Sequence, residues 1–405
     1  MLSSTIALIA IAGSALVSAI PYSRHPSSNS SRSTYPTISP SEAFPTAIKV
    51  DATKFEYPLS DGFPAAVQDL ANIEQVAGGT LPNATPSPLS SPDGVLGVAD
   101  QTLAVLRLIA FNELSEVAFF TELLTNITDN VPGYNLGFGF DRDYILASLK
   151  AIQAQEQLHA LNANAALATF DKKNITGPIQ PCEYKFPVSN FQEAINLANT
   201  FTDVVLGTLQ DAVTALGANG DIGLIRGIAA VIGQEGQQDR FFRFLQDRTP
   251  SAQPFLTASA GPFAFSALNQ MFVVPGSCPQ DINSFGLPPV LGSLNVQYGP
   301  LGPGDQTLTF NAVESPSYQV SNFSDLQVVY ISGQNLPVVE PVTNVESMGN
   351  GTWKFQAFFP QATDIMHGLT IAALTPSMVI FNSTSTVDDV ANAALFGPAL
   401  IEILE

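Results

Sequence analysis

A glutamate and a histidine that could bind a metal ion lie close together in the stretch LKAIQAQEQLHALNANAAL, residues 149–167. Glu156 and His159 are three residues apart, so a helix would present both side chains on one face. The whole chain has only three histidines, and only 12% of its residues are charged. In a helix bundle, a carboxylate can bridge two metal ions while the imidazole at this spacing binds one. The pair is therefore the first candidate for chemistry.

Four segments with a helical period carry this pair and its candidate partners. In each of them the apolar residues advance by alternating threes and fours, which is typical of the buried seam of a helix bundle. The segments cover roughly residues 98–126, 142–170, 190–217 and 222–247. The link between the second and third is longer than the other links and is predicted to cross over between two helical hairpins.

Three of the four seams turn polar near mid-helix. The pairs that interrupt them are Glu113 and Glu116, Glu156 and His159, and Glu235 and Gln238. A buried carboxylate is costly unless it is paired or bound to a metal. Three interruptions at a similar helical depth therefore predict one shared polar site.

A complete carboxylate-bridged di-metal site takes a lone Glu and a Glu-x-x-His from each of two helical hairpins. The first hairpin supplies Glu113 or Glu116, then Glu156 and His159. The second hairpin departs from the pattern, because Thr202 stands in the third seam and Gln238 stands where a histidine belongs. Asp203 lies next to Thr202 but about 100° off that face of the helix.

Residues from about 98 to 275 resemble the secreted ferritin-like domain proteins of fungi, described as stress-response or late sexual-development proteins and distantly related to plant desiccation-related proteins. The motifs that carry the resemblance are LIAFNELSEVAFFTELL, AIQAQEQLHALNANAAL, FTDVVLGTLQDAV and IAAVIGQEGQQDRFF; the tail ending GPALIEILE is also similar. The resemblance implies a ferritin-like four-helix bundle with a di-metal ligand pattern. Thr202 replaces the third-helix glutamate of that pattern, and Gln238 replaces the fourth-helix histidine.

This departure leaves three interpretations of the site. The polar residues form a buried hydrogen-bond network without metal, or they hold one weakly bound ion, Fe or Mn, or they hold two. The missing ligands favour the first interpretation over the second, and the second over the third. The candidate metal ligands are Glu113, Glu116, Glu156, His159 and Glu235. No catalytic residue is predicted, and the chain has neither a Gly-x-Ser-x-Gly elbow nor a Walker loop.

The beginning of the chain, MLSSTIALIAIAGSALVSAIP, is an apolar run that ends in small residues. It predicts a secretory signal peptide over residues 1–19, with a retained membrane anchor as the alternative. Residues 20–95 are rich in Ser and Pro and are predicted to be a largely disordered leader.

Sequons and cysteines agree with secretion to the extracellular space or cell wall. Seven Asn-x-Ser/Thr sequons are candidate glycosylation sites: Asn29, Asn83, Asn126, Asn174, Asn322, Asn350 and Asn382. The only two cysteines, Cys182 and Cys278, are predicted to form one disulfide in an oxidising compartment, with two free buried thiols as the alternative. The formal net charge of −20, with only 15 basic residues, argues against a nucleic-acid partner. No stable membrane insertion is predicted either.

From about residue 290 the apolar pattern has a period of two. The runs DQTLTFNAV, DLQVVYIS, TWKFQAFF and LTIAALT predict strands of a small antiparallel β-sandwich. Trp353 is expected in its core and His367 in a loop. If this part binds wall polysaccharide, Phe355, Phe358 and Phe359 are the residues to examine for an exposed aromatic strip.

The predicted fold class is therefore α+β and multidomain, with a ferritin-like helical domain over 96–285 and a β-sandwich over 286–405. The predicted protein is a secreted glycoprotein with a degenerate bundle and a non-catalytic role in stress response or development at the cell surface. A metal-binding protein or metal-dependent oxidoreductase that uses the partial site is one alternative. A protein that binds cell-wall glycans is the other.

Overall fold

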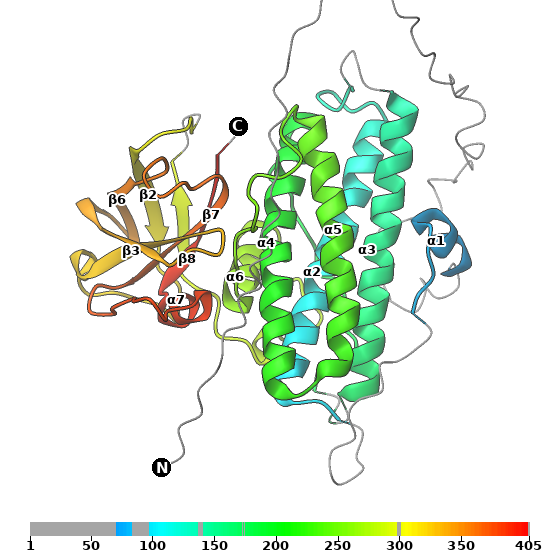
Figure 1. Cartoon of the computed structure of the whole chain (residues 1–405), viewed down its shortest axis with the longest axis horizontal. Coiled ribbons are helices and arrows are strands. Elements are labelled where there is room, and N and C mark those ends of the chain that lie inside the picture. Colours follow the sequence, from blue (N-terminus) through cyan, green and yellow to red (C-terminus); the bar gives the residue numbers. More distant parts are fainter. Residues whose placement is uncertain are drawn as a thin grey trace, which may run out of the picture. The chain divides into compact units, whose positions relative to one another are not determined.

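The computed structural model describes residues 70–82, 97–136, 141–171, 173, 175–297 and 301–403. They contain both helices and antiparallel sheets (Figure 1), as the predicted α+β class requires, and these elements belong to one compact unit. The predicted signal peptide lies outside the described residues. No helix in the described part of the chain is long and apolar enough to cross a membrane.

Four long helices match the four predicted segments. They are α2 (Asp100–Thr128), α3 (Arg142–Phe170), α4 (Phe191–Asn219) and α5 (Ile225–Leu245). Two of them have a polar N-cap. The side chain of Asp141 accepts hydrogen bonds from backbone amides at the start of α3, and that of Asn190 accepts one at the start of α4. Gly220, in the left-handed conformation with φ of 82°, ends α4.

The long helices pack as two hairpins, α2 with α3 and α4 with α5, and α2 also contacts α4 (Figure 1). Phenylalanines join the hairpins. The rings of Phe119 and Phe201 meet edge to face at 5.1 Å, and those of Phe120 and Phe242 stack at 5.9 Å. All four side chains are at most 8% exposed, so this aromatic packing holds α2, α4 and α5 in register.

Three shorter helices are not among the predicted elements. They are α1 (Leu70–Ala77), α6 (Gly261–Met271) and α7 (Val387–Ala393). α1 falls within the predicted leader, and it is helical because Ile73, 1% exposed, packs against Ala154 and Leu161 of α3. Residues 20–69 and 83–95 of that leader lie outside the described residues. In α7, Thr386 and Asp389 form a capping box, a local signal that the sequence analysis missed.

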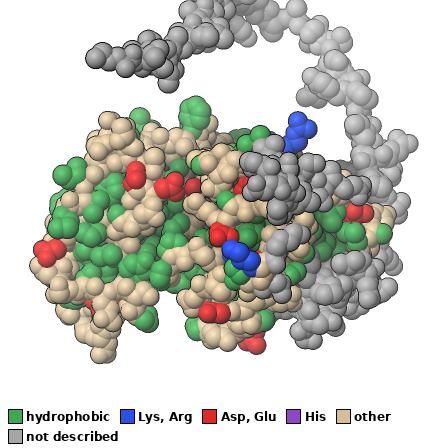
Figure 2. Space-filling view, turned by 90° about the horizontal axis from the view of Figure 1, so that it is seen from below, with side chains coloured by type: hydrophobic (Ala, Val, Ile, Leu, Met, Phe, Trp, Pro, Cys, Tyr) green, Lys and Arg blue, Asp and Glu red, His purple; other side chains and the backbone are tan. Residues whose placement is uncertain are grey.

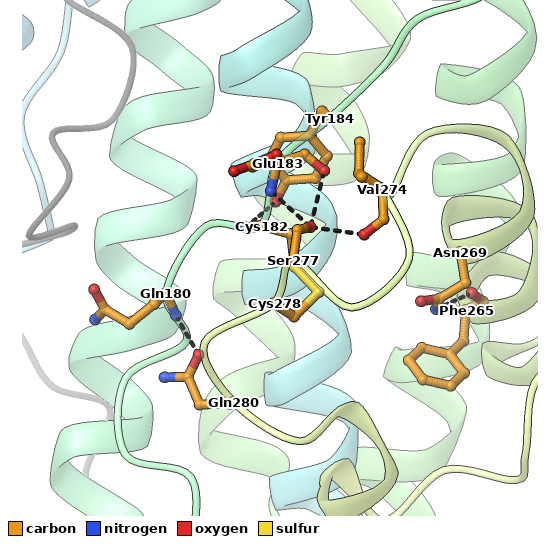
Figure 3. The surroundings of a disulfide bond; sticks show 10 residues. All are labelled: Gln180, Cys182, Glu183, Tyr184, Phe265, Asn269, Val274, Ser277, Cys278 and Gln280. Carbon is orange, nitrogen blue, oxygen red and sulfur yellow. Dashed lines mark hydrogen bonds between the residues drawn. A yellow bond between two sulfur atoms is a disulfide. The ribbon is translucent and has the colours of Figure 1, made fainter.

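Cys182 and Cys278 form the predicted disulfide (Figure 3). It joins the connection between α3 and α4 to the segment after α6. Backbone pairing supports it there, because the amide of Val274 donates to the carbonyl of Glu183 at 2.9 Å. The amide of Glu183 in turn donates to the hydroxyl of Ser277 at 3.0 Å. The disulfide therefore closes a connection that hydrogen bonds already align.

The strands form two antiparallel four-stranded sheets. One has the order β1 (Ser293–Val296), β2 (Gln306–Val313), β6 (Thr352–Phe359), β5 (Thr343–Gly349). The other has the order β4 (Val338–Pro341), β3 (Leu326–Ser332), β7 (Gly368–Pro376), β8 (Phe396–Ile403). Side chains of both sheets, among them Phe310, Phe355 and Tyr330, share one apolar core. Trp353 packs against this core and stacks on Phe323 at 5.0 Å.

The sheet that contains β3 and β7 has both faces covered. All seven residues of β3 are buried, whereas burial alternates along β2. Val328 and Tyr330 point into the core between the sheets, but Val329 and Ile331 belong to the core that the helices share. This double burial explains why VVYI and LTIAAL are apolar runs rather than alternating ones.

The seven sequons are placed unequally. Asn322, Asn350 and Asn382 are exposed, and Asn126 is half-buried. Asn29, Asn83 and Asn174 lie outside the described residues. Attachment of glycans is consequently sterically open at three positions in the β-strand part, and glycosylation itself stays a prediction.

Replacing both Cys182 and Cys278 by Ser is expected to destabilise the protein by about 2–4 kcal/mol, because the cross-link closes a long loop of the unfolded chain. The separation of the two residues is 96 positions. Urea unfolding of the double variant and the wild type, followed by circular dichroism, measures the difference. An unchanged midpoint and slope would contradict the expectation.

Candidate metal site

Four ionisable side chains from three helices meet inside the bundle. Glu113 lies on α2, Glu156 and His159 on α3, and Glu235 on α5, and each offers one ligand atom within 4.8 Å of the others. The three glutamates are at most 1% exposed, and the side chain of His159 is 13% exposed. The predicted convergence of the polar interruptions is therefore present for these four residues.

The carboxylates surround one nitrogen of the imidazole. Nδ1 of His159 lies 2.8 Å from Oε2 of Glu156, 3.4 Å from Oε2 of Glu113 and 3.8 Å from Oε1 of Glu235. A proton on Nδ1 makes this an ion-pair cluster. In the same arrangement, three carboxylate oxygens and one ring nitrogen surround the position that a small cation would occupy.

The seam of the bundle holds this polar centre in place. Glu156 and His159 share a face because they are one helical turn apart, and buried Ile152 and Ala163 lie on either side of them on α3. On α5, Phe242 lies two turns from Glu235 and is fully buried. Apolar packing on both sides therefore fixes the depth of the site in the bundle.

Several oxygens in the site have no hydrogen-bond donor among the described residues. They are Oε2 of Glu113 and both carboxylate oxygens of Glu235. Buried polar atoms are nearly always satisfied, so each unsatisfied oxygen points to a missing proton or cation. Carboxylate oxygens with free lone pairs are also what a metal ion needs as ligands.

Glu116, the other candidate of the first helix, lies beside this group rather than in it. Its Oε1 accepts a hydrogen bond from Asn112 at 2.8 Å. It is close enough to Glu113, Glu156 and Glu235 for their charges to act on it. The structure thus distinguishes between the two first-helix candidates: Glu113 points at His159, and Glu116 is held by its neighbour on α2.

Gln238 and Thr202 occupy the positions where the ferritin-like pattern expects ligands. Nε2 of Gln238 donates a hydrogen bond of 2.6 Å to Oε1 of Glu156. Thr202 is 2% exposed and contributes a hydroxyl, not a carboxylate. Glu156 is therefore engaged at both oxygens, one by Gln238 and one by His159. The second hairpin contributes one carboxylate ligand, Glu235.

Asp203 does not substitute for the glutamate missing at position 202. It is buried on another face of α4, where Asn199 donates to both Asp203 and Asp239. Arg248 donates to Asn199 at 2.6 Å and to Glu402 of β8 at 2.6 Å. This second polar network, which the sequence analysis missed, ties α4 and α5 to the last strand. It lacks the unpartnered cluster of ligand oxygens that marks the first.

Burial changes the protonation of the site. It raises the pKa of Glu113 from 4.5 to about 7, although nearby His159 acts in the opposite direction. Burial, with the charge of Glu113 and Glu156, also raises the pKa of Glu235 well above its ordinary value. For His159, burial lowers the pKa, but Glu156 and Glu113 outweigh it, so the pKa lies well above 6.5. Without a metal, the cluster therefore retains protons near neutral pH.

A cavity of about 70 Å³ borders Glu113 and His159. Its walls are otherwise largely apolar and come from all four long helices; they include Leu106, Ala166, Leu209, Gly227 and Val231. The cavity provides room for a small molecule next to the ligand cluster.

The three phenylalanines named for examination on the β-strand part do not form an exposed aromatic strip. Phe355 and Phe359 are fully buried between the sheets, and only Phe358, 42% exposed, faces solvent. Phe355 stacks on Phe310 at 5.1 Å, which explains why an alternating strand turns it inward. Binding of wall glycans stays a prediction without this strip. On the face drawn in Figure 2, Lys and Arg side chains are isolated rather than gathered into a patch.

Sequence comparison does not identify a family. A scan of the chain against protein-family models gives no match, and a search of curated proteins gives none either. The function is therefore argued from the geometry of the site.

The metal-free protein is expected to lose stability as the pH rises from about 4.5 to 7. Glu113 has a pKa near 7 in the folded protein and 4.5 ordinarily, and Asp239 shifts from 3.8 to about 7. A carboxyl whose pKa is higher when folded binds its proton more tightly in that state, so its contribution exists at low pH and disappears as the pH passes through the folded pKa. His159, with a raised pKa, acts in the same direction.

Thermal unfolding of chelator-treated protein tests this. The midpoint should be higher at pH 5 than at pH 8 by about 5 °C or more. The lowered pKa values of Asp171, Glu193 and Asp305 act in the opposite direction, but only near and below their ordinary values, outside this window. A midpoint that is constant or rises toward pH 8 would show that the buried carboxyls do not govern stability.

Proposed function

We propose that this protein is a secreted metal-binding protein that holds one divalent ion, Fe²⁺ or Mn²⁺, at Glu113, Glu156, His159 and Glu235. The observation that carries the proposal is the convergence of four ligand atoms within 4.8 Å from three helices. The site lies in what we interpret as a degenerate ferritin-like bundle, followed by a β-sandwich. The resemblance to fungal stress-response and sexual-development proteins supports both interpretations.

The ligand chemistry favours a hard or intermediate divalent cation. Three carboxylate oxygens and one imidazole nitrogen suit iron and manganese, whereas a thiolate-rich set would be needed to favour softer ions. A dication would also supply the partner that Glu235 lacks, since neither of its buried oxygens has a donor. It would displace the proton from Nδ1 of His159, because a metal-bound imidazole nitrogen cannot retain its proton.

One ion fits these residues better than two. A second ion would need the third-helix carboxylate that Thr202 replaces and the histidine that Gln238 replaces. Gln238 also turns an amide donor toward Oε1 of Glu156, and a donor there competes with a second cation for that oxygen. Glu116, the remaining carboxylate, is held by Asn112.

The cellular role that we propose is at the cell surface, in stress response or development. The predicted signal peptide, the disulfide between Cys182 and Cys278 and the exposed sequons support a secreted glycoprotein. We favour a non-catalytic role, such as metal retention. The cavity beside Glu113 and His159 favours a metal-dependent oxidoreductase as the second candidate, because it leaves space for a ligand from solution.

Metal analysis of the secreted protein tests the proposal. Protein purified without chelators should contain about one Fe or Mn per chain by mass spectrometry, and the Glu156→Ala, His159→Ala double variant should contain almost none. Glu122→Gln, on α2 but outside the cluster, serves as the matched control and should retain the metal. Metal no higher in the wild type than in the double variant would establish a buried hydrogen-bond network without metal.

Titration calorimetry of the metal-free protein adds a quantitative check. Glu235→Gln is expected to weaken Mn²⁺ binding by at least about tenfold, since it removes the negative charge of one of the proposed carboxylate ligands. The Glu122→Gln control should bind as the wild type does. Equal affinity in Glu235→Gln and wild type would remove α5 from the site.

A further inference from the structure

A chain of amide side chains connects the proposed metal site to the surface helix α1. Gln155 of α3 lies between them: its Nε2 donates to the carbonyl of Ala77 at 3.2 Å, and its Oε1 accepts from Nε2 of Gln238 at 3.2 Å. The same oxygen also accepts from Nε2 of Gln234, likewise on α5, at 2.9 Å. Nε2 of Gln238 also donates to Glu156 at 2.6 Å. The contacts therefore run without a gap from the last residue of α1 to a ligand of the site.

The direction of this chain is determined at both ends. The carbonyl of Ala77 can only accept, so Gln155 must turn its NH₂ group toward α1 and its oxygen toward α5. The carboxylate of Glu156 accepts the second proton of the Gln238 NH₂ group. A rotation of Gln155 would leave two donors without acceptors, which couples the orientation of Gln238 to the docking of α1.

Helix α1 is held against α3 by this contact and by an apolar cluster around the buried side chain of Ile73. It has eight residues, with no acidic residue in its first turn and no basic residue in its last, and a helix of that length is marginal on its own. Ile73 packs against Ala154 and Leu161 of α3. Gln155 satisfies a carbonyl at the C-terminal end of α1, where the helix has no amide of its own to offer.

We propose that α1 is a cap whose docking tunes the metal site, and that Gln155 is the positioning residue that couples the two. The inference rests on the proposed function for its metal-bound half. When α1 is docked, Gln155 holds Gln238, and Gln238 holds Glu156 in the orientation that leaves its other oxygen toward the site. By linkage, an ion in the site then stabilises the docked cap, and the docked cap raises the affinity for the ion.

The metal-free half of the experiment tests the chain of amide side chains from α1 to Glu156, here called the relay, without any contribution from a metal. In the full chain, Gln238→Leu removes the middle of the relay from α5, and hydrogen exchange of residues 70–77 reports the docking of α1. Exchange there should become at least about threefold faster than in the wild type, while residues 387–393 of α7 stay unchanged as an internal reference. Gln192→Leu, an exposed glutamine on α4, is the matched control. Unchanged exchange in α1 would overturn the relay.

The metal-bound half uses Mn²⁺ as the probe. Gln155→Leu should weaken Mn²⁺ binding at least about fivefold, the lower end of coupling between linked sites, and should change the electron paramagnetic resonance spectrum of the bound ion. In the wild type, Mn²⁺ should slow exchange in α1, and in Gln155→Leu it should not. Wild-type affinity and spectrum in Gln155→Leu would overturn the tuning of the site by the cap.

The two halves separate the two proposals. A wild type that binds no Mn²⁺ contradicts the proposed function and the tuning, whereas the exchange of α1 in metal-free Gln238→Leu still decides whether the relay exists. Suppose that exchange in α1 is faster in Gln238→Leu but Mn²⁺ affinity is unchanged in Gln155→Leu. The relay would then exist, but α1 would have a structural role only.

Discussion

The interior of the helix bundle depends on how three buried carboxylates are neutralised. Glu113, Glu156 and Glu235 lie around Nδ1 of His159 and are almost fully removed from water. Charges of one sign at such distances repel strongly where little water screens them. A proton or a metal ion has to lie between them to offset this repulsion. The cluster is therefore either protonated or bound to a metal. The packing of α2, α3 and α5 is arranged around that requirement.

Helix α3 contacts several parts of the protein, because neighbouring residues on it lie on different faces of the helix. Glu156 and His159 face the seam, whereas Gln155, one position away and about 100° around the helix, reaches both α1 and α5. Ala154 and Leu161 then receive the apolar side of α1. A single helix thus carries the ligands, the support for a ligand and the surface to which the cap binds. On the proposed coupling, a change in any of these contacts would reach the candidate ligands through neighbouring residues of one helix.

The features that could be predicted from the sequence are those that give side chains a regular spacing. The stripes that predicted the four long helices match α2 to α5 within a few residues, and the interruptions at Glu113, Glu156 and Glu235 lie together because equal helical depth brings them together. Runs such as TLTFNAV predicted β2 because one of its faces is less covered than the other. The same period of two places Phe355 and Phe359 on the buried face of β6 and Phe358 on its exposed face.

Individual contacts between elements produce no such periodic signal in the sequence. Gln155 does not lie in the seam, and its contacts are visible only when α1 and α5 are placed on either side of it. Helix α1 is too short and too close to a Ser- and Pro-rich region for its apolar spacing to stand out. The network around Asp203, Arg248 and Glu402 joins positions nearly 200 residues apart. A pattern that recurs every three or four residues contains no information about such pairings.

The half-complete ligand set is itself informative about chemistry. A histidine at position 238 would bring a second acceptor nitrogen to the site, and the observed glutamine brings an amide donor instead, aimed at Glu156. On the interpretation of the bundle as a degenerate ferritin-like one, the second hairpin orients a candidate ligand at this position instead of supplying one. An amide in this position occupies one oxygen of Glu156 and leaves the other, Oε2, beside Nδ1 of His159, where a single cation could bind it. The substitution that weakens the case for two ions therefore strengthens the case for one.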